Sequence, residues 1–239
     1  MTRAIPKVVE RLLARADTQL GPEYSAVLYG SWVRGDVLEG RSDVNLLLVA
    51  PRITPAELRG LSGELAVFEA ERMAPPLLFT TEEWRRAGDS FPIEITDMKL
   101  AYRMLRGADP LAGMKVRPGD LRRSLESELR GKLLRLRADY ALYASRPELL
   151  AAVVGHSIGS FRVLFRGVLT LGAVAVPGDD GALAQAAGRL CGFAPGPLEA
   201  ALAHRRHTAW RCAPDVFESY LGVIEQATQY VDTVHPGVH

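Results

Sequence analysis

The sequence predicts an α/β (α+β) domain with a small mixed sheet, followed by an all-α helical bundle domain. From Ser25 to Met98 short apolar runs alternate with helical patterns, which is typical of an α/β layer. Farther along, apolar side chains recur at steps of three and four residues over long segments, as they do in amphipathic helices. A segment rich in glycine and proline separates the two patterns. We therefore expect domains at 1–112 and 118–239.

The elements of the first domain follow from its apolar residues. The N-terminal segment predicts an amphipathic helix, because Glu10 and Arg11 interrupt the apolar core that a signal peptide needs. Thr54, followed by a proline and an early acid, predicts a helix start, and Thr81 predicts another. Four runs suit strands: 25–29, 44–49, 76–79 and 92–96. The first domain is thus expected to be a four-stranded sheet with helices on it.

The second domain is predicted to be helical throughout. The expected helices are 121–143, 148–171, 181–191, 196–209 and 214–233. The most apolar stretch, 149–176, contains His156, Arg162 and Arg166, so a buried bundle helix is favoured over a membrane span. His156 is expected to lie in the core, because it sits on an apolar helix among small residues.

Composition limits the partners and the compartment. The chain has 239 residues, of which 48% are hydrophobic, and a formal net charge of +1. A nearly neutral chain has no global field to attract nucleic acid or an anionic membrane, so we expect neither as a partner. Cys191 and Cys212 lack CxxC spacing and imply no disulfide framework or thiolate zinc site, which favours the cytoplasm. The sequence does not determine the oligomeric state, and a homodimer is one possibility.

The segment 29–49 carries the candidate chemistry. A strand runs into Gly30 and Ser31, where backbone N–H groups at a helix start suit the phosphates of a nucleoside triphosphate. The next strand begins after Ser42, and alternation places Asp43 and Asn45 on one face. Oxygen ligands on one face suit Mg²⁺, which stabilises phosphoryl displacement. Nearby, Arg34 and Arg41 could contact phosphate, although a solvated loop arginine is the commoner case.

This pattern of Gly30-Ser31, Gly35 and Ser42-Asp43-Val44-Asn45 before an apolar strand resembles the signature of the DNA polymerase β-like nucleotidyltransferase superfamily. With its added helical domain, the chain also looks like the aminoglycoside nucleotidyltransferases and related small bacterial proteins. The resemblance implies that Gly30 and Ser31 hold the triphosphate and that Asp43 binds the metal. It also implies a third acid on a neighbouring strand.

The sequence departs from the superfamily pattern at position 45, where Asp-x-Asp becomes Asp-Val-Asn. An amide oxygen can still ligate a hard cation, but one negative charge is lost, which counts against a two-metal site. The third acid is either Glu94 or Asp97. Glu94 is preferred as ligand and base, because it would lie mid-strand between two buried isoleucines, whereas Asp97 could cap a helix.

Two classes of function remain after these arguments. The first is an enzyme that transfers a nucleoside monophosphate, with Mg²⁺, from an NTP to a hydroxyl of a small molecule or protein. The second is a catalytically degenerate binding protein, or an antitoxin-like regulator, with the same fold. Walker A and GxGxxG loops are absent from the sequence, so NTPase and dehydrogenase functions have no support.

Overall fold

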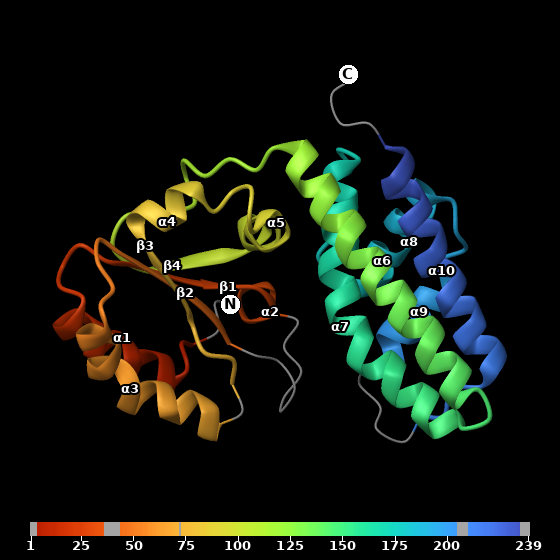
Figure 1. The fold of residues 1–239 in the computed structure, drawn as a ribbon, viewed down its shortest axis with the longest axis horizontal. Coiled ribbons are helices and arrows are strands. Elements are labelled where there is room, and N and C mark those ends of the chain that lie inside the picture. The colour runs from red at the N-terminus through yellow and green to blue at the C-terminus, as the bar shows by residue number, and fades with distance from the viewer. Residues whose placement is uncertain (1–3, 36–43, 72, 205–209, 235–239) are drawn as a thin grey trace. The chain divides into compact units, whose positions relative to one another are not determined.

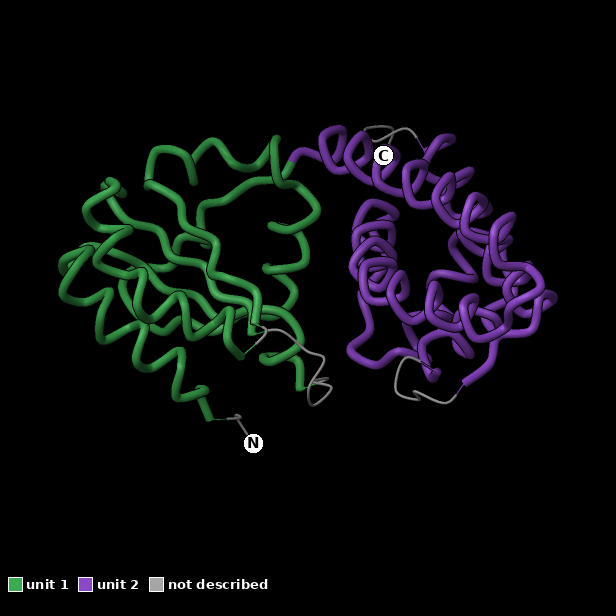
Figure 2. Tube along the Cα trace, turned by 60° about the horizontal axis from the view of Figure 1, so that its bottom comes forward, with its two compact units in different colours: residues 1–116 green, residues 117–239 purple. Residues whose placement is uncertain are grey.

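The chain divides into two compact units, at residues 1–116 and 117–239 (Figure 2). The computed structural model describes residues 4–35, 44–71, 73–204 and 210–234. Each unit has an apolar core of its own, and each is described here by itself.

Within the described residues, unit 1 contains one mixed four-stranded sheet of order β3-β2-β1-β4 (Figure 1). Strand β1 pairs antiparallel with β2 and with β4, whereas β2 and β3 are parallel. The strands are β1 (Ser25–Tyr29), β2 (Asn45–Ala50), β3 (Leu77–Thr80) and β4 (Tyr102–Arg106). The register of the β1–β2 pair places Tyr29 opposite Asn45 at one end of the sheet. This sheet agrees with the predicted small mixed sheet.

Helices cover both faces of the sheet, as Figure 1 shows. These helices are α1 (Lys7–Gln19), α2 (Ser31–Arg34), α3 (Pro55–Ala70), α4 (Thr81–Arg86) and α5 (Pro92–Leu100). Leu46 and Leu48 face the core beneath α1 and α3, and Leu47 faces the core beneath α4 and α5. Because both faces are buried, β2 is an almost continuous apolar run. A capping box begins α3 at Thr54, as predicted, and another begins α4 at Thr80, one residue before the predicted Thr81.

The expected strand at 92–96 is wrong, because these residues belong to α5. Proline at the first position has a dihedral angle that suits a helix start, and its missing N–H costs nothing there. The alternation of Ile93, Glu94 and Ile95 is also compatible with a helix that is buried on most sides, since residues 95–98 are all buried. The fourth strand is β4, which follows α5 directly. Glu94 and Asp97 are therefore presented by a helix.

Unit 2 is helical in all its described regular elements. They are α6 (Pro118–Tyr143), α7 (Pro147–Leu171), α8 (Asp180–Cys191), α9 (Gly196–His204) and α10 (Pro214–Thr233). Helix α6 packs against α7 and α10, and α7 also contacts α8 and α9. The apolar face of each helix is buried in the core, as Leu125 and Leu129 of α6 and Phe217 of α10 show. Together these helices form the expected bundle.

Helix α7 is the one helix, among the residues described, that is long and apolar enough to cross a membrane. A single such helix is weak evidence for a span, because the core helix of a bundle passes the same test. Arg162 is buried within α7, and its Nε donates to Asp180 Oδ1 at 2.8 Å. His156 is exposed, contrary to the expected core position, because the α7 face that carries it borders a groove.

Candidate functional site

The turn after β1 requires glycine. Gly30 has φ +78° and ψ −146°, a region that other residues rarely adopt. Its carbonyl accepts from the N–H groups of Val33 and Arg34, both at 3.1 Å, and thereby begins α2. Ser31 is the first residue of α2 and is partly exposed. The strand, glycine turn and short helix predicted from the sequence are therefore present.

The side chain of Asn45 lies directly over this turn. A Cβ atom on Gly30 would be 2.7 Å from Asn45 Nδ2, which is closer than real Cβ contacts. Asn45 is the first residue of β2 and is paired with Tyr29, the last residue of β1. The backbone at residue 30 can approach the carboxamide only because residue 30 has no side chain. The structure thus brings the predicted residues Gly30 and Asn45 into contact.

An ion pair connects α2 to α5 beside the turn. Arg34 Nη1 lies 3.4 Å from both carboxylate oxygens of Asp97. Both side chains are largely buried, with 11% and 12% of their surfaces exposed. Burial lowers the effective dielectric constant around a pair of charges and strengthens their attraction. Asp97 is therefore a buried, paired carboxylate close to the glycine turn.

Both carboxyl groups of α5, on Glu94 and Asp97, lie close enough to Tyr29 for their charges to act on its phenol. Tyr29 is the last residue of β1 and pairs with Asn45, so these carboxyl groups are near that end of the sheet. The pKa of Tyr29 is raised well above the ordinary value, chiefly by burial and then by the negative charges of Asp97 and Glu94. Glu94 is exposed, whereas Asp97 is buried. Figure 1 shows α2 and α5 at this end of the sheet. Glu94 loses the mid-strand position that favoured it, and Asp97 becomes the carboxyl beside Arg34.

Three residues of the predicted site lie outside the described residues: Arg41, Ser42 and Asp43. Among the residues that the structure describes, no group of three or more His, Cys, Asp or Glu side chains could hold a metal ion. The described side-chain oxygen donors at this end of the sheet include the Asn45 amide, the Glu94 carboxylate and the Asp97 carboxylate, and Asp97 is already paired with Arg34. Such hard oxygen donors fit one Mg²⁺ ion only together with Asp43, and they do not supply a two-metal set.

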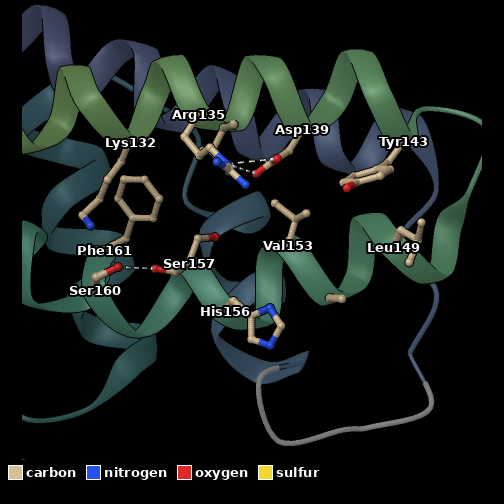
Figure 3. Close-up of a pocket in the computed structure, with 12 residues that line it drawn as sticks. Lys132, Arg135, Asp139, Tyr143, Leu149, Val153, His156, Ser157, Ser160 and Phe161 are labelled. Carbon is tan, nitrogen blue, oxygen red and sulfur yellow. Dashed lines mark hydrogen bonds and ion pairs between the residues drawn. The ribbon is translucent and has the colours of Figure 1, made fainter.

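Unit 2 contains a groove of about 500 Å³ between α6 and α7 (Figure 3). On the α6 wall, Arg135 Nε lies 3.1 and 3.2 Å from the two carboxylate oxygens of Asp139. The Asp139 side chain is only 12% exposed, whereas that of Arg135 is 79% exposed. His156 and Ser160 line the α7 wall. The groove combines a carboxylate, hydroxyl and imidazole groups with apolar walls, as small-molecule sites do.

A small mixed sheet, a glycine turn into a short helix and an added helical unit together define a nucleotidyltransferase-like fold. Among solved structures, the chain is similar to the spectinomycin adenyltransferase AAD(9) from Enterococcus faecialis, crystallised with ATP and spectinomycin. The two share 12% sequence identity with a TM-score of 0.58, and the match covers 95% of this chain and 99% of the other. No family model and no curated protein matches the sequence. The likeness confirms the fold expected from the sequence.

Proposed function

We propose that this protein is a nucleotidyltransferase that transfers a nucleoside monophosphate from an NTP to a hydroxyl group of a small molecule. The observation that carries the proposal is the Gly30 turn beneath Asn45, with Asp97 and Glu94 presented from α5 at the same end of the sheet. The N–H of Gly30 donates to the carbonyl of Ala101, at 3.2 Å, so Gly30 contributes the space in which a phosphate can approach the turn. Ser31 would bind the triphosphate through its backbone N–H and its hydroxyl. The match to an adenyltransferase crystallised with ATP supports an NTP as the substrate.

The roles of the side chains follow from their exposure and charge. Asp43 and the Asn45 amide would hold Mg²⁺, which when bound stabilises negative charge on the phosphates. Glu94, the exposed carboxylate, accepts the proton of the acceptor hydroxyl. The acceptor oxygen then forms a bond to the α-phosphorus, the bond from that phosphorus to the bridging oxygen breaks, and pyrophosphate leaves with the electron pair.

In unit 2, the groove between α6 and α7 has the size and lining of a small-molecule site. Its volume lies within the range of sites for small ligands, and its walls offer Asp139, Ser157 and Ser160 to polar groups. The similar adenyltransferase was crystallised with spectinomycin, which is also a small molecule.

Calorimetry and a transfer assay test the proposal directly. Wild type should bind ATP with Mg²⁺ and should transfer radiolabel from an NTP to at least one acceptor in a panel of aminoglycosides and nucleosides. Asp43→Ala should lose transfer and weaken nucleotide binding in Mg²⁺, because the main metal carboxylate is removed. Asp89→Ala, which removes an exposed carboxylate of the same unit, is the control and should behave as wild type. The absence of nucleotide binding in wild type would refute the proposal.

A second candidate is a binding or antitoxin-like regulatory protein with a degenerate site. Two observations favour it: the neutral Asn45 at a ligand position, and the pairing of Asp97 with Arg34. Asn45→Asp distinguishes the candidates. In an enzyme weakened by the amide, the restored carboxylate should tighten Mg²⁺ or Mn²⁺ binding and increase transfer. In a degenerate protein it should bind metal without turnover.

A further inference from the structure

Arg135 is held in the wall of the α6–α7 groove through one of its three guanidinium nitrogens. Its Nε donates to both carboxylate oxygens of Asp139, and within the described part of the chain Nη1 and Nη2 have no hydrogen-bond partner in the protein. The side chain is exposed, and Figure 3 shows its guanidinium in the space between α6 and α7. The groove therefore contains N–H donors on Nη1 and Nη2 that a ligand can reach.

Asp139 fixes the orientation of this guanidinium. The Asp139 side chain is largely buried, and Arg135 is its hydrogen-bond partner among the described residues. Because Nε faces that carboxylate, the edge of the guanidinium formed by Nη1 and Nη2 is left for another partner. The N–H groups on this edge match the two oxygens of a second carboxylate, which is the geometry of a bidentate pair. Asp139 is thus a positioning residue, and Arg135 is the residue that contacts a ligand.

The charges at the groove favour an anion over a cation. Lys132 and Arg135 line it together with one carboxylate, that of Asp139. Two further charged groups contact lining residues: Glu128 lies 3.5 Å from the Lys132 ammonium, and Arg146 lies 5.0 Å from the centre of a lining aromatic ring. These three cations and two carboxylates leave one positive charge in excess, to which the imidazole on the α7 wall adds when it is protonated. Both carboxylates already have a cation as partner, so an ammonium ligand would meet no unpaired acid among these groups.

The rest of the groove suits the body of an organic molecule. Its walls include the side chains of Leu149, Val153 and Phe161, which offer apolar surface. Ser160 Oγ donates its proton to the Ser157 carbonyl at 2.9 Å, so its lone pairs can accept a hydrogen bond from a ligand hydroxyl. A volume of about 500 Å³ lies within the range of small-molecule sites. The lining thus fits a molecule with an apolar body and a hydroxyl group.

We infer that this groove binds a small hydroxy acid, whose carboxylate pairs with Arg135 and whose apolar body packs against the walls. A single excess charge and one bidentate edge match a monoanion better than a phosphate dianion or a polycation. The binding itself is independent of the nucleotide site. As a statement about the acceptor of group transfer, the inference rests on the proposed function, and it then assigns a carboxylate to that acceptor.

Titration of the whole chain with mandelate, followed by NMR of its methyl groups, tests the inference. Mandelate combines a phenyl ring, a hydroxyl and a carboxylate, whereas phenylethanolamine has an ammonium group in place of the carboxylate and mandelamide is neutral. Wild type should bind mandelate about tenfold or more tightly than either analogue, with shifts of the Leu149 and Val153 methyl groups. Phenyl phosphate, which is mostly a dianion at neutral pH, should bind more weakly than mandelate.

Arg135→Gln should weaken mandelate binding by about tenfold or more and remove the preference over mandelamide. Arg123→Gln is the matched control, because Arg123 is an exposed arginine of α6 that pairs with a largely buried carboxylate, Asp120, and does not line the groove. It should bind mandelate as wild type does. Arg135→Gln leaves Asp139 buried without its partner, so the double variant Arg135→Gln with Asp139→Asn, which removes both charges, should show the same loss even if the single variant does not fold.

Two variants at position 139 test the positioning role. By charge alone, Asp139→Ala would bind mandelate more tightly than wild type, because a negative charge leaves the groove. If Asp139 orients Arg135, this variant should instead bind mandelate about threefold or more weakly, since the guanidinium must be ordered on binding. Asp139→Asn keeps an oxygen that accepts from Nε and should restore binding at least to that of wild type. Tighter binding in Asp139→Ala would contradict the positioning role.

The results that overturn the inference are distinct from those that overturn the proposed function. The inference is wrong if wild type does not bind mandelate, if phenylethanolamine binds as tightly as mandelate, or if phenyl phosphate binds more tightly. It is also wrong if folded Arg135→Gln binds mandelate as wild type does. None of these results bears on ATP binding in Mg²⁺, on which the proposed function depends. A protein that binds mandelate in the groove but binds no nucleotide would keep the inferred ligand site and reject the proposed transfer.

Discussion

Gly30→Ala is the substitution that most directly tests the geometry of the turn. The new Cβ would meet Asn45 Nδ2 at 2.7 Å, so the carboxamide must move. The backbone at φ +78° and ψ −146° adds strain of about 1–3 kcal/mol for a residue other than glycine. Displacing a packed side chain adds about 1–3 kcal/mol. We expect unit 1 to lose roughly 2–6 kcal/mol of stability, the sum of the two contributions.

A double-mutant cycle with Asn45→Ala separates the two contributions. In that background the clash is gone and only the backbone strain remains, so Gly30→Ala should cost less by about 1 kcal/mol or more. Gly21→Ala is a control for a positive-φ substitution without a clash, because Gly21 has φ +77° and an added Cβ would have nothing within 4 Å. It should leave nucleotide binding unchanged, whereas Gly30→Ala should abolish it.

Urea unfolding followed by hydrogen exchange of peptides from unit 1 measures these free energies separately from those of unit 2. An additive cycle would refute the reasoning, because it would mean that the Asn45 carboxamide does not occupy the space above Gly30. Equal losses for Gly30→Ala and Gly21→Ala would refute it as well. Unchanged nucleotide binding in Gly30→Ala would show that the phosphates do not approach this turn.

Three further predictions concern packing and pH. The Tyr24 hydroxyl donates a hydrogen bond to Asp17 at 2.5 Å, which lowers the pKa of Asp17 in the folded protein. The ionised carboxylate therefore stabilises the fold at pH values above the ordinary pKa of an aspartate. This stabilisation is lost as the pH falls through the lowered pKa of the folded state. Tyr24→Phe should flatten the fall of the urea midpoint below about pH 4, the ordinary range of an aspartate. Gly167→Ala should destabilise unit 2 by about 1–3 kcal/mol in thermal unfolding, because its Cβ would lie 2.9 Å from the buried Leu125. Gly155→Ala, on the same helix with nothing within 4 Å, should instead stabilise it by about 0.5–1 kcal/mol.

Much of the fold could be predicted because its signals are local. Both faces of β2 are buried, so its apolar run was evident without knowledge of its neighbours. Thr54 and Thr80 occupy N-cap positions with a glutamate three residues later, a capping box that can be read from the sequence. The second helix was predicted one residue too late, at Thr81. The helices of unit 2 have long amphipathic repeats and were predicted within a few residues. At 92–96 the sequence signal is ambiguous, because the Ile-Glu-Ile alternation favours a strand whereas Pro92 favours a helix start.

The candidate site could be predicted only in part. Gly30, Ser31 and Asn45 lie within 15 residues of one another, and strand pairing alone brings them together. The Arg34–Asp97 pair joins residues 63 apart through the orientation of α5, which no local pattern determines. A proline at the first helical position, Glu94 in the first turn and Lys99 in the last turn were the available signals for that helix. Had they been followed, Glu94 and Asp97 would share a helix in the prediction too.

Because Asn45 packs against the Gly30 turn, substitutions at position 45 can change charge and packing separately. The Asn45 carboxamide lies against the backbone of Gly30, so any larger or branched replacement would disturb the turn as well as the chemistry. Aspartate has nearly the same shape, and Asn45→Asp therefore changes the charge over the turn while the contact is retained. A change in metal or nucleotide affinity in this variant reports electrostatics, whereas the same change in Asn45→Ala would combine charge, packing and a lost ligand. The interpretation of position 45 thus depends on comparing these two variants, with unit 1 stability measured for each.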